Sequence, residues 1–210
     1  SGIIASLDLT SRQAKISLHF DPQKPLILIL VGSQGSERIN NFVFENLPEL
    51  LKLGQIYHQV GDLNLKNADE NRRTMIVEAK SVEEEYRLTG FFDIAGLREV
   101  FAAADLVISR AGAGAIFEIA AFGKPSILVP LQESANGHQR ANAYEYAKSG
   151  AAEVIEEANF TINILKTQIQ NILDNPEKMG DMIIAAHEFA KPEAADILAK
   201  EIVKLSLGKA

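Results

Sequence analysis

Two glycine-rich segments of this chain have residue types that suit the binding of an anionic ligand. Residues 32–36 read GSQGS and follow the aliphatic run LILILV, and residues 112–115 read GAGA and come shortly after the apolar run LVIS. Glycines let the backbone approach a ligand closely, and a helix that begins at such a turn offers free N–H groups and a positive dipole end to an anion. Either turn alone could be a tight connection between strand and helix, but two of them favour a phosphate-bearing ligand. Neither has the spacing of a dinucleotide fingerprint or a P-loop.

An acidic residue, Glu118, follows the second turn inside the expected helix. A carboxylate near a helix start can simply complement the helix dipole. The same position, close to a phosphate site, would also allow the carboxylate to accept two hydrogen bonds from a ribose diol. The sequence leaves both interpretations open.

A third polar cluster lies in PLQESANGHQRANA at residues 130–143, after the apolar run SILV. His138 could act as a general base, but no Asp or Ser partner is in view, and a polar residue at a helix start explains it better. Gln139 and Asn142 offer amide donors and acceptors, which suit sugar hydroxyl groups better than proton transfer.

Six apolar runs alternate with segments whose apolar residues recur at helical spacing. This alternation predicts an α/β fold with a parallel sheet covered by helices on both faces. The expected strands are Leu26–Val31, Gln55–Val60, Tyr86–Gly90, Leu106–Ser109, Ser126–Val129 and Glu153–Ile155. Ligands of such sheets bind beyond the carboxyl ends of the strands, where both glycine turns fall.

Capping residues and prolines indicate where the helices begin and end. Asp93–Ala104 is typical of a capped helix, and the helix after the third polar cluster should stop at Gly150. The Thr161 hydroxyl can cap a further helix, and from there the chain is expected to be helical nearly to its end, with breaks around Pro176 and Pro192. The polar stretch 64–85 mixes acidic and basic residues and is expected to form a solvated helix beside a loop.

Composition limits the classes of function. A chain of 210 residues with 47% hydrophobic content can bury one substantial core, so we expect a single domain. The net charge of −7 gives no basic surface for nucleic acid and no polybasic membrane tether. The chain has no cysteine, which excludes disulfides and thiolate metal sites and fits a reducing cytoplasm. No apolar run approaches the ~20 residues of a membrane span.

Three motifs together resemble a known family. They are LVGSQGS at residues 30–36, AADLVISRAGAGAIFEIAAFGKPSILVPL at residues 103–131, and GHQRANA at residues 137–143 with the following KSGAAEVIEE. In this order and spacing they are similar to the MurG family of bacterial peptidoglycan transferases, which add N-acetylglucosamine to lipid I, an undecaprenyl-pyrophosphoryl-muramoyl-pentapeptide, to make lipid II. The resemblance runs from Asp21 to the C-terminus and implies the Rossmann-like C-terminal domain of a GT-B glycosyltransferase, which holds UDP-N-acetylglucosamine.

The resemblance also implies roles for individual residues. The donor-binding set that it implies is Ser33, Gln34 and Gly35 with Gly112 and Ala113 at the diphosphate, Arg110 as a phosphate contact or a buried structural residue, Glu118 at the ribose, the backbone near Phe92 at the uracil edge, and His138 and Gln139 at the sugar. Ala115 stands where the family often has threonine, which removes any hydroxyl contact there. No metal cofactor is expected, since the chain has no D-x-D motif to hold one.

The resemblance further implies that the chain is half of an inverting hexosyltransferase. Residues 1–20 would be a lead-in from a missing N-terminal domain or linker, and residues 21–210 would be the donor-binding domain with its C-terminal helices. A first residue Ser1, rather than methionine, agrees with that expectation. The general base, the lipid I site and the membrane contact would lie in the missing domain, on the cytoplasmic face of the inner membrane, where the whole enzyme would serve cell-wall synthesis, cell shape and division.

Two alternatives stay open at this point. The chain could be a non-catalytic UDP-sugar-binding subunit that works with a separate membrane partner, as in the two-chain eukaryotic dolichol-linked transferase. It could also belong to another GT-B enzyme, such as a UDP-sugar epimerase. The length of the parent gene would distinguish the first alternative from a half-enzyme, and analysis of the reaction product would distinguish the second.

Overall fold

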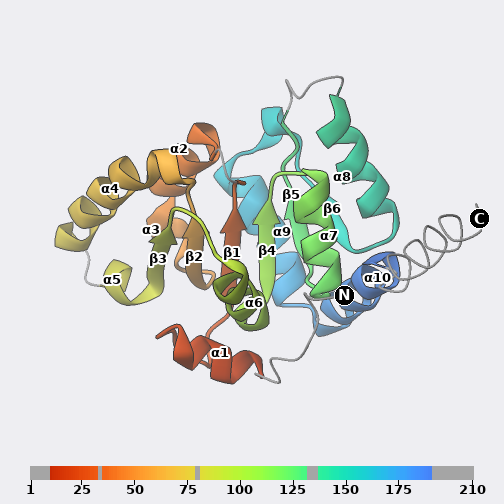
Figure 1. Cartoon of the computed structure of the whole chain (residues 1–210), viewed down its shortest axis with the longest axis horizontal. Helices are drawn as coiled ribbons and strands as arrows, with labels where there is room; N and C mark the ends of the chain where they lie inside the picture. Colours follow the sequence, from red (N-terminus) through yellow and green to blue (C-terminus); the bar gives the residue numbers. More distant parts are fainter. Residues whose placement is uncertain (1–9, 33–34, 79–80, 132–136, 191–210) are drawn as a thin grey trace, which may run out of the picture.

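The computed structural model describes residues 10–32, 35–78, 81–131 and 137–190. Within these residues, six parallel strands form one sheet in the order β3-β2-β1-β4-β5-β6 (Figure 1). The strands are β1 Leu26–Leu30, β2 Gln55–Gln59, β3 Tyr86–Thr89, β4 Leu106–Ser109, β5 Ser126–Leu128 and β6 Ala152–Val154. All six expected strands are therefore confirmed, with ends that differ by at most one residue.

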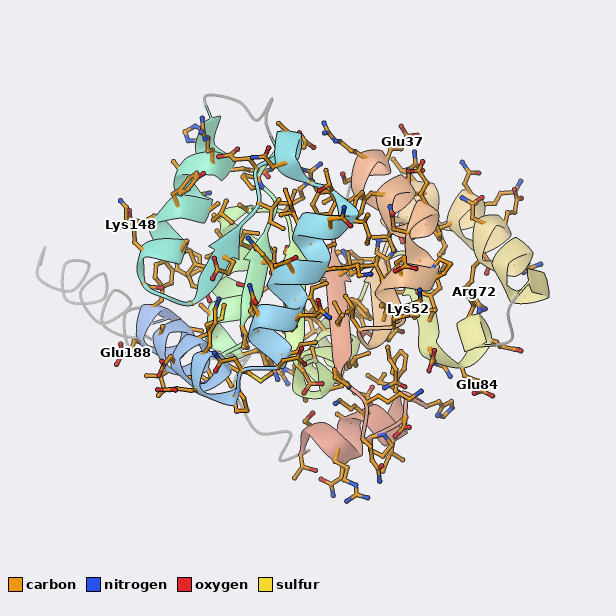
Figure 2. The ribbon with its side chains drawn as sticks, turned by 180° about the vertical axis from the view of Figure 1, so that it is seen from behind. Glu37, Lys52, Arg72, Glu84, Lys148 and Glu188 are labelled. Carbon is orange, nitrogen blue, oxygen red and sulfur yellow. The ribbon has the colours of Figure 1, made fainter. Side chains whose placement is uncertain are left out.

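Helices cover both faces of the sheet. Every side chain of the central strand β1 is therefore buried. Ile27 and Ile29 belong to one apolar cluster, and Leu28 and Leu30 belong to another on the opposite face. The first cluster includes side chains of α2, α3 and α9, and the second includes side chains of α6, α7, α8 and α10. Figure 1 shows α6 and α7 in front of the strands, whereas α9 lies in front in the reverse view of Figure 2.

The helices agree with most of the sequence-based boundaries. Their bounds are α1 Ser11–Ser17, α2 Glu37–Glu45, α3 Leu47–Leu50, η1 Asp62–Asn64, α4 Leu65–Glu78, α5 Ser81–Glu85, α6 Ile94–Ala103, α7 Ala113–Ala121, α8 His138–Lys148, η3 Glu157–Asn159, α9 Ile162–Leu173 and α10 Pro176–Ala190. The Asp93 side chain caps α6 by accepting a hydrogen bond from Gly96 N at 2.7 Å. Gly150, with φ 90°, follows the end of α8, and Pro176 begins α10 after the first expected break. The second expected break, around Pro192, lies outside the described residues.

Two local expectations are wrong. Thr161 is the N-cap residue of α9, but within the described residues its side chain makes no capping hydrogen bond. The stretch expected to be one helix beside a loop instead carries the two helices α4 and α5, joined by residues 79–80, which lie outside the described part. Mixed charge indicates solvent exposure, and it does not by itself distinguish a loop from a short helix.

The helix α1 was not expected, and it packs against α6 at the amino-terminal edge of the sheet (Figure 1). A capping box between Thr10 and Gln13 begins it. Lys15 on its inner side is 5% exposed and donates to Asp105 Oδ2 at 2.6 Å. Asp105 Oδ2 also accepts from the Leu26 backbone N–H at 2.8 Å, so this ion pair connects α1 to the starts of β1 and β4. The division of the chain at residue 21 stays a prediction.

A buried histidine lies on β2. His58 is fully buried, and its Nδ1 lies 3.0 Å from the Tyr86 hydroxyl oxygen on β3. Burial disfavours the charged imidazolium and lowers the pKa of His58 from 6.5 to about 3. The folded protein therefore keeps this ring neutral over a pH range in which the unfolded chain protonates it.

This difference predicts a pH-dependent stability. Between pH 6.5 and about 3 the unfolded state binds one more proton at His58 than the folded state, so stability falls as the pH is lowered through that window. The full contribution of one proton is about 1.4 kcal/mol per pH unit. The substitution His58→Asn should make the free energy of unfolding less dependent on pH between 6.5 and 5, measured by urea denaturation. Equal slopes for the variant and the parent chain would contradict the assignment.

Candidate functional site

The carboxyl ends of β1 and β4 lie next to each other at the centre of the sheet. From β1 the chain continues outward to β2 and β3, and from β4 it continues in the opposite direction to β5 and β6. The strand order thus reverses between β1 and β4, and a crevice at such a reversal is where open α/β sheets bind ligands. Both glycine turns follow these two strands, so the fold brings them together at that crevice.

The first turn, after β1, has two glycines in a left-handed backbone conformation. The φ angles are 80° at Gly32 and 77° at Gly35, and Gly35 N donates to Gly32 O at 3.1 Å. A Cβ atom at Gly35 would overlap the Asn64 side chain and lie 2.7 Å from Val60 O. Glycine is therefore required here by both backbone angle and space. Ser33 and Gln34, which were predicted to face a diphosphate, lie outside the described residues.

The second turn, after β4, leaves open space above a helix start. Gly112 is the N-cap residue of α7, and no side chain in the described part of the chain caps the helix. Its φ of −67° is accessible to any residue, and a Cβ atom at Gly112 or Gly114 would have no atom of the described residues within 4 Å. The backbone N–H groups at Ala113 and in the rest of the first turn of α7 therefore border an uncrowded region, which suits an anion.

Glu118 lies on α7, the helix that begins at the second turn. Its side chain is partly buried, and burial raises the pKa of its carboxyl group above the ordinary value. No hydrogen bond joins this carboxylate to the other described residues, so it remains an available acceptor near the crevice. Its predicted contact with ribose is compatible with this arrangement and stays a prediction.

The third polar cluster meets the second turn through α8. His138 is exposed in the first turn of that helix. The Gln139 Oε1 accepts from the Leu131 backbone N–H at 3.0 Å, which attaches the start of α8 to the chain just after β5. Asn142 Nδ2 donates to Ala111 O at 3.3 Å, beside the second turn. The two side-chain amides that were expected to bind sugar hydroxyl groups therefore make hydrogen bonds to the backbone at Leu131 and Ala111.

Arg110 occupies the position between β4 and the second turn and is 8% exposed. Its guanidinium donates to Val129 O at 3.2 Å, to the Ser36 hydroxyl at 2.8 Å and to the Glu157 carboxylate at 2.7 Å. These contacts give Arg110 a structural role, and a contact with a ligand phosphate stays a prediction. Sequence reasoning missed Ser36 and Glu157, which are visible in the sequence only as a helix cap and one residue of an acidic pair.

The remaining predicted contact, Phe92, follows β3 and is 7% exposed. Its ring packs edge-on against Tyr57 with centroids 5.0 Å apart, so only the backbone there is suited to a ligand. For metal ions, the described residues contain no group of three or more His, Cys, Asp or Glu side chains that could form a site.

Comparison with known proteins agrees with this geometry. The sequence profile described as glycosyltransferase family 28 C-terminal domain matches residues 26–198. The chain belongs to this family. The matched range begins at β1 and includes both glycine turns, Glu118 and the start of α8. The GT-B fold expected from the motifs is confirmed by the family and by the solved structures that resemble this domain.

Several relatives of this family 28 domain carry the same name. A protein of Anaeromyxobacter sp. (strain K), 36% identical over 190 residues, is named UDP-N-acetylglucosamine–N-acetylmuramyl-(pentapeptide) pyrophosphoryl-undecaprenol N-acetylglucosamine transferase, and the match covers 87% of this chain and 46% of that protein. A protein of Thermodesulfovibrio yellowstonii with the same name is 35% identical, with 90% and 50% covered. The crystal structure of Acinetobacter baumannii MurG superposes with a TM-score of 0.68 at 28% identity, over 87% of this chain and 52% of that one. The chain therefore spans about half the length of these relatives.

The two turns predict responses of different size to an added methyl group. Gly35→Ala should destabilise the domain by about 1–3 kcal/mol, because alanine disfavours a φ of 77° and its Cβ would overlap Asn64. Gly112→Ala should instead change stability by less than about 1 kcal/mol, because the angle is ordinary, no described atom lies near the added methyl group, and the entropy gain is offset by the poorer N-cap preference of alanine. Urea denaturation measures both changes. A large loss of stability in Gly112→Ala would show that the space above α7 is not open.

Proposed function

We propose that this family 28 domain is the donor-binding half of an inverting glycosyltransferase that moves N-acetylglucosamine from UDP-N-acetylglucosamine to lipid I, giving lipid II. The observation that carries the proposal is the pair of glycine turns beside each other at the strand-order reversal, one of them opening onto the free start of α7. The names of the relatives supply the chemical identity of donor and acceptor.

The donor would lie across the crevice from β3 to β5. The roles that we propose are the Ser33, Gln34 and Gly35 loop with the Gly112 and Ala113 N–H groups at the diphosphate, Glu118 at the ribose hydroxyls, the backbone at Phe92 at the uracil edge, and His138 with Gln139 at the sugar. The half-buried position of Glu118 supports its role, because a hydrogen bond to a charged acceptor is stronger where water is partly excluded.

The reaction is a single displacement at the anomeric carbon. The acceptor hydroxyl oxygen forms the new bond to that carbon, the bond to the UDP oxygen breaks, and the electron pair leaves with UDP. The proton of the attacking hydroxyl goes to a general base on the amino-terminal half. Negative charge grows on the diphosphate during this step, so the N–H groups at the start of α7 stabilise the transition state electrostatically.

We also propose that residues 21–210 form this donor domain and that a separate amino-terminal half supplies the lipid I site and the membrane contact. The relatives support this, since each is about twice as long as the matched segment. None of the described helices is long and apolar enough to cross a bilayer. By its resemblance to the MurG family, we also propose that the whole enzyme works peripherally on the cytoplasmic face of the membrane.

The first test concerns Glu118. Glu118→Ala should weaken UDP binding about ten- to a hundred-fold, because hydrogen bonds to a charged acceptor contribute about 1.5–3 kcal/mol. Burial raises the pKa of this carboxyl group, so it becomes protonated, and UDP affinity falls, at a higher pH than an ordinary glutamate would give. Glu118→Gln should make UDP affinity less dependent on pH. Calorimetry measures both effects. Equal affinity of the parent chain for UDP and for its 2′-deoxy analogue would contradict the ribose contact.

The second test concerns turnover. The 210-residue chain should bind UDP but transfer no sugar to a lipid I analogue, because alignment of the acceptor can contribute ~7–11 kcal/mol to lowering the barrier and the aligning groups belong to the other half. The full-length protein from the native gene should make the β-linked product. Transfer by this chain alone at a comparable rate would contradict the proposal. A native gene that encodes only these residues would favour a subunit with a separate membrane partner.

A further inference from the structure

Two ion pairs lie at opposite ends of the same strand, β4. Asp105 precedes β4 and pairs with Lys15, and Arg110 follows β4 and pairs with Glu157. The side chains are 6% and 24% exposed in the first pair and 10% and 7% exposed in the second. The pairs have similar chemistry, but only the second borders the proposed donor site. The four residues of β4 separate Asp105 from Arg110, and the five steps of extended chain between them span about 16 Å.

The Arg110–Glu157 pair connects four strands at the carboxyl edge. Arg110 itself follows β4, and its NH1 donates to Val129 O just after β5. Its NH2 donates to the hydroxyl of Ser36, the N-cap residue of α2 after β1, and to Glu157 Oε1, which lies after β6. One guanidinium therefore joins the first glycine turn to the second across the strand-order reversal.

Glu157 keeps that guanidinium in place. It begins η3 and is 6% exposed, so its carboxylate faces Arg110 with little screening by water. Arg38 on α2 adds a second cation, with NH1 3.7 Å from Glu157 Oε2 and NH2 donating to Glu157 O at 2.8 Å. Removal of the Glu157 carboxylate would leave a buried guanidinium without its counter-charge, which favours its rotation toward solvent and breaks its bonds to Ser36 and Val129.

We propose that Glu157 is a positioning residue for the donor site: acting through Arg110, it sets the spacing between the two glycine turns. The proposal rests on the proposed function for its ligand, since the spacing matters only if both turns hold the same diphosphate. Glu157 touches no reacting group. Its effect is that Ser36 at the end of the first turn and Arg110 before the second are held together before the diphosphate binds, which lowers the cost of binding.

The test compares the two ion pairs. Glu157→Ala and Asp105→Ala each remove one carboxylate from an ion pair beside β4 whose cation is nearly buried, and each should lower the urea midpoint. At a temperature where both are folded, calorimetry should show UDP affinity reduced about tenfold or more in Glu157→Ala and nearly unchanged in Asp105→Ala. Glu157→Gln should recover part of the affinity, because its amide oxygen can still accept from Arg110.

A second measurement separates positioning from ligand chemistry. In the ligand-free protein, the backbone amide resonances of Gly32, Gly35 and Gly112 should shift in Glu157→Ala and stay in place in Asp105→Ala. If the parent chain fails to bind UDP, the proposed function is wrong, and these amide shifts still decide whether Glu157 positions the turns.

Three results would overturn the proposal. The first is a folded Glu157→Ala protein in which neither the UDP affinity nor the glycine amide resonances differ from the parent chain. The second is an equal loss of UDP affinity in Asp105→Ala, and the third is no recovery of UDP affinity in Glu157→Gln. Should Glu157→Ala not fold, Ser36→Ala breaks the same connection at its other end. It should then shift the Gly112 amide and weaken UDP binding, and an unchanged Ser36→Ala protein would equally overturn the proposal.

Discussion

The right-handed crossover between parallel strands is the constraint on which the rest of this domain depends. A right-handed crossover from β1 to β2 places α2 on one face of the sheet, and one from β4 to β5, running the opposite way, places α7 on the other. The two connections therefore diverge from adjacent strands and leave a crevice between two helix starts. The position of the ligand site is therefore set by the backbone topology and does not depend on the particular side chains around it.

Sequence patterns predicted the sheet well because its strands are buried on both faces. The run LILILV of β1 has no polar face that could confuse strand with helix or loop, and its ends are set by Pro25 and Gly32. The turns after β1 and β4 were visible for the same reason, since glycines directly follow such runs. The helix α1 was missed because the capping pair Thr10 and Gln13 is its only signal in the sequence. Its stability comes from packing on α6 and from the contact between Lys15 and Asp105.

The parts of the site that could not be predicted depend on contacts between distant residues. Glu157 lies 47 positions from Arg110 in the sequence, and Ser36 lies 74 positions from it. A buried acid and a buried base are each unfavourable alone, so the sequence shows two apparent surface residues where the fold makes one internal pair. The hydrogen bond between the Gln139 amide and the Leu131 backbone could not be predicted either, because it depends on how α8 returns to the end of β5.

The alternation of side chains along β1 has a consequence for how such domains diverge. Ile39 of α2 and Ile116 of α7 belong to separate apolar clusters, which meet at the sheet and at α10, where Met182 belongs to the first cluster and Ala186 to the second. Exchanges of apolar side chains can accumulate in one core without displacing the helix supported by the other. Drift is thus tolerated independently on each side of the sheet, whereas groups that span both sides have to change together or not at all.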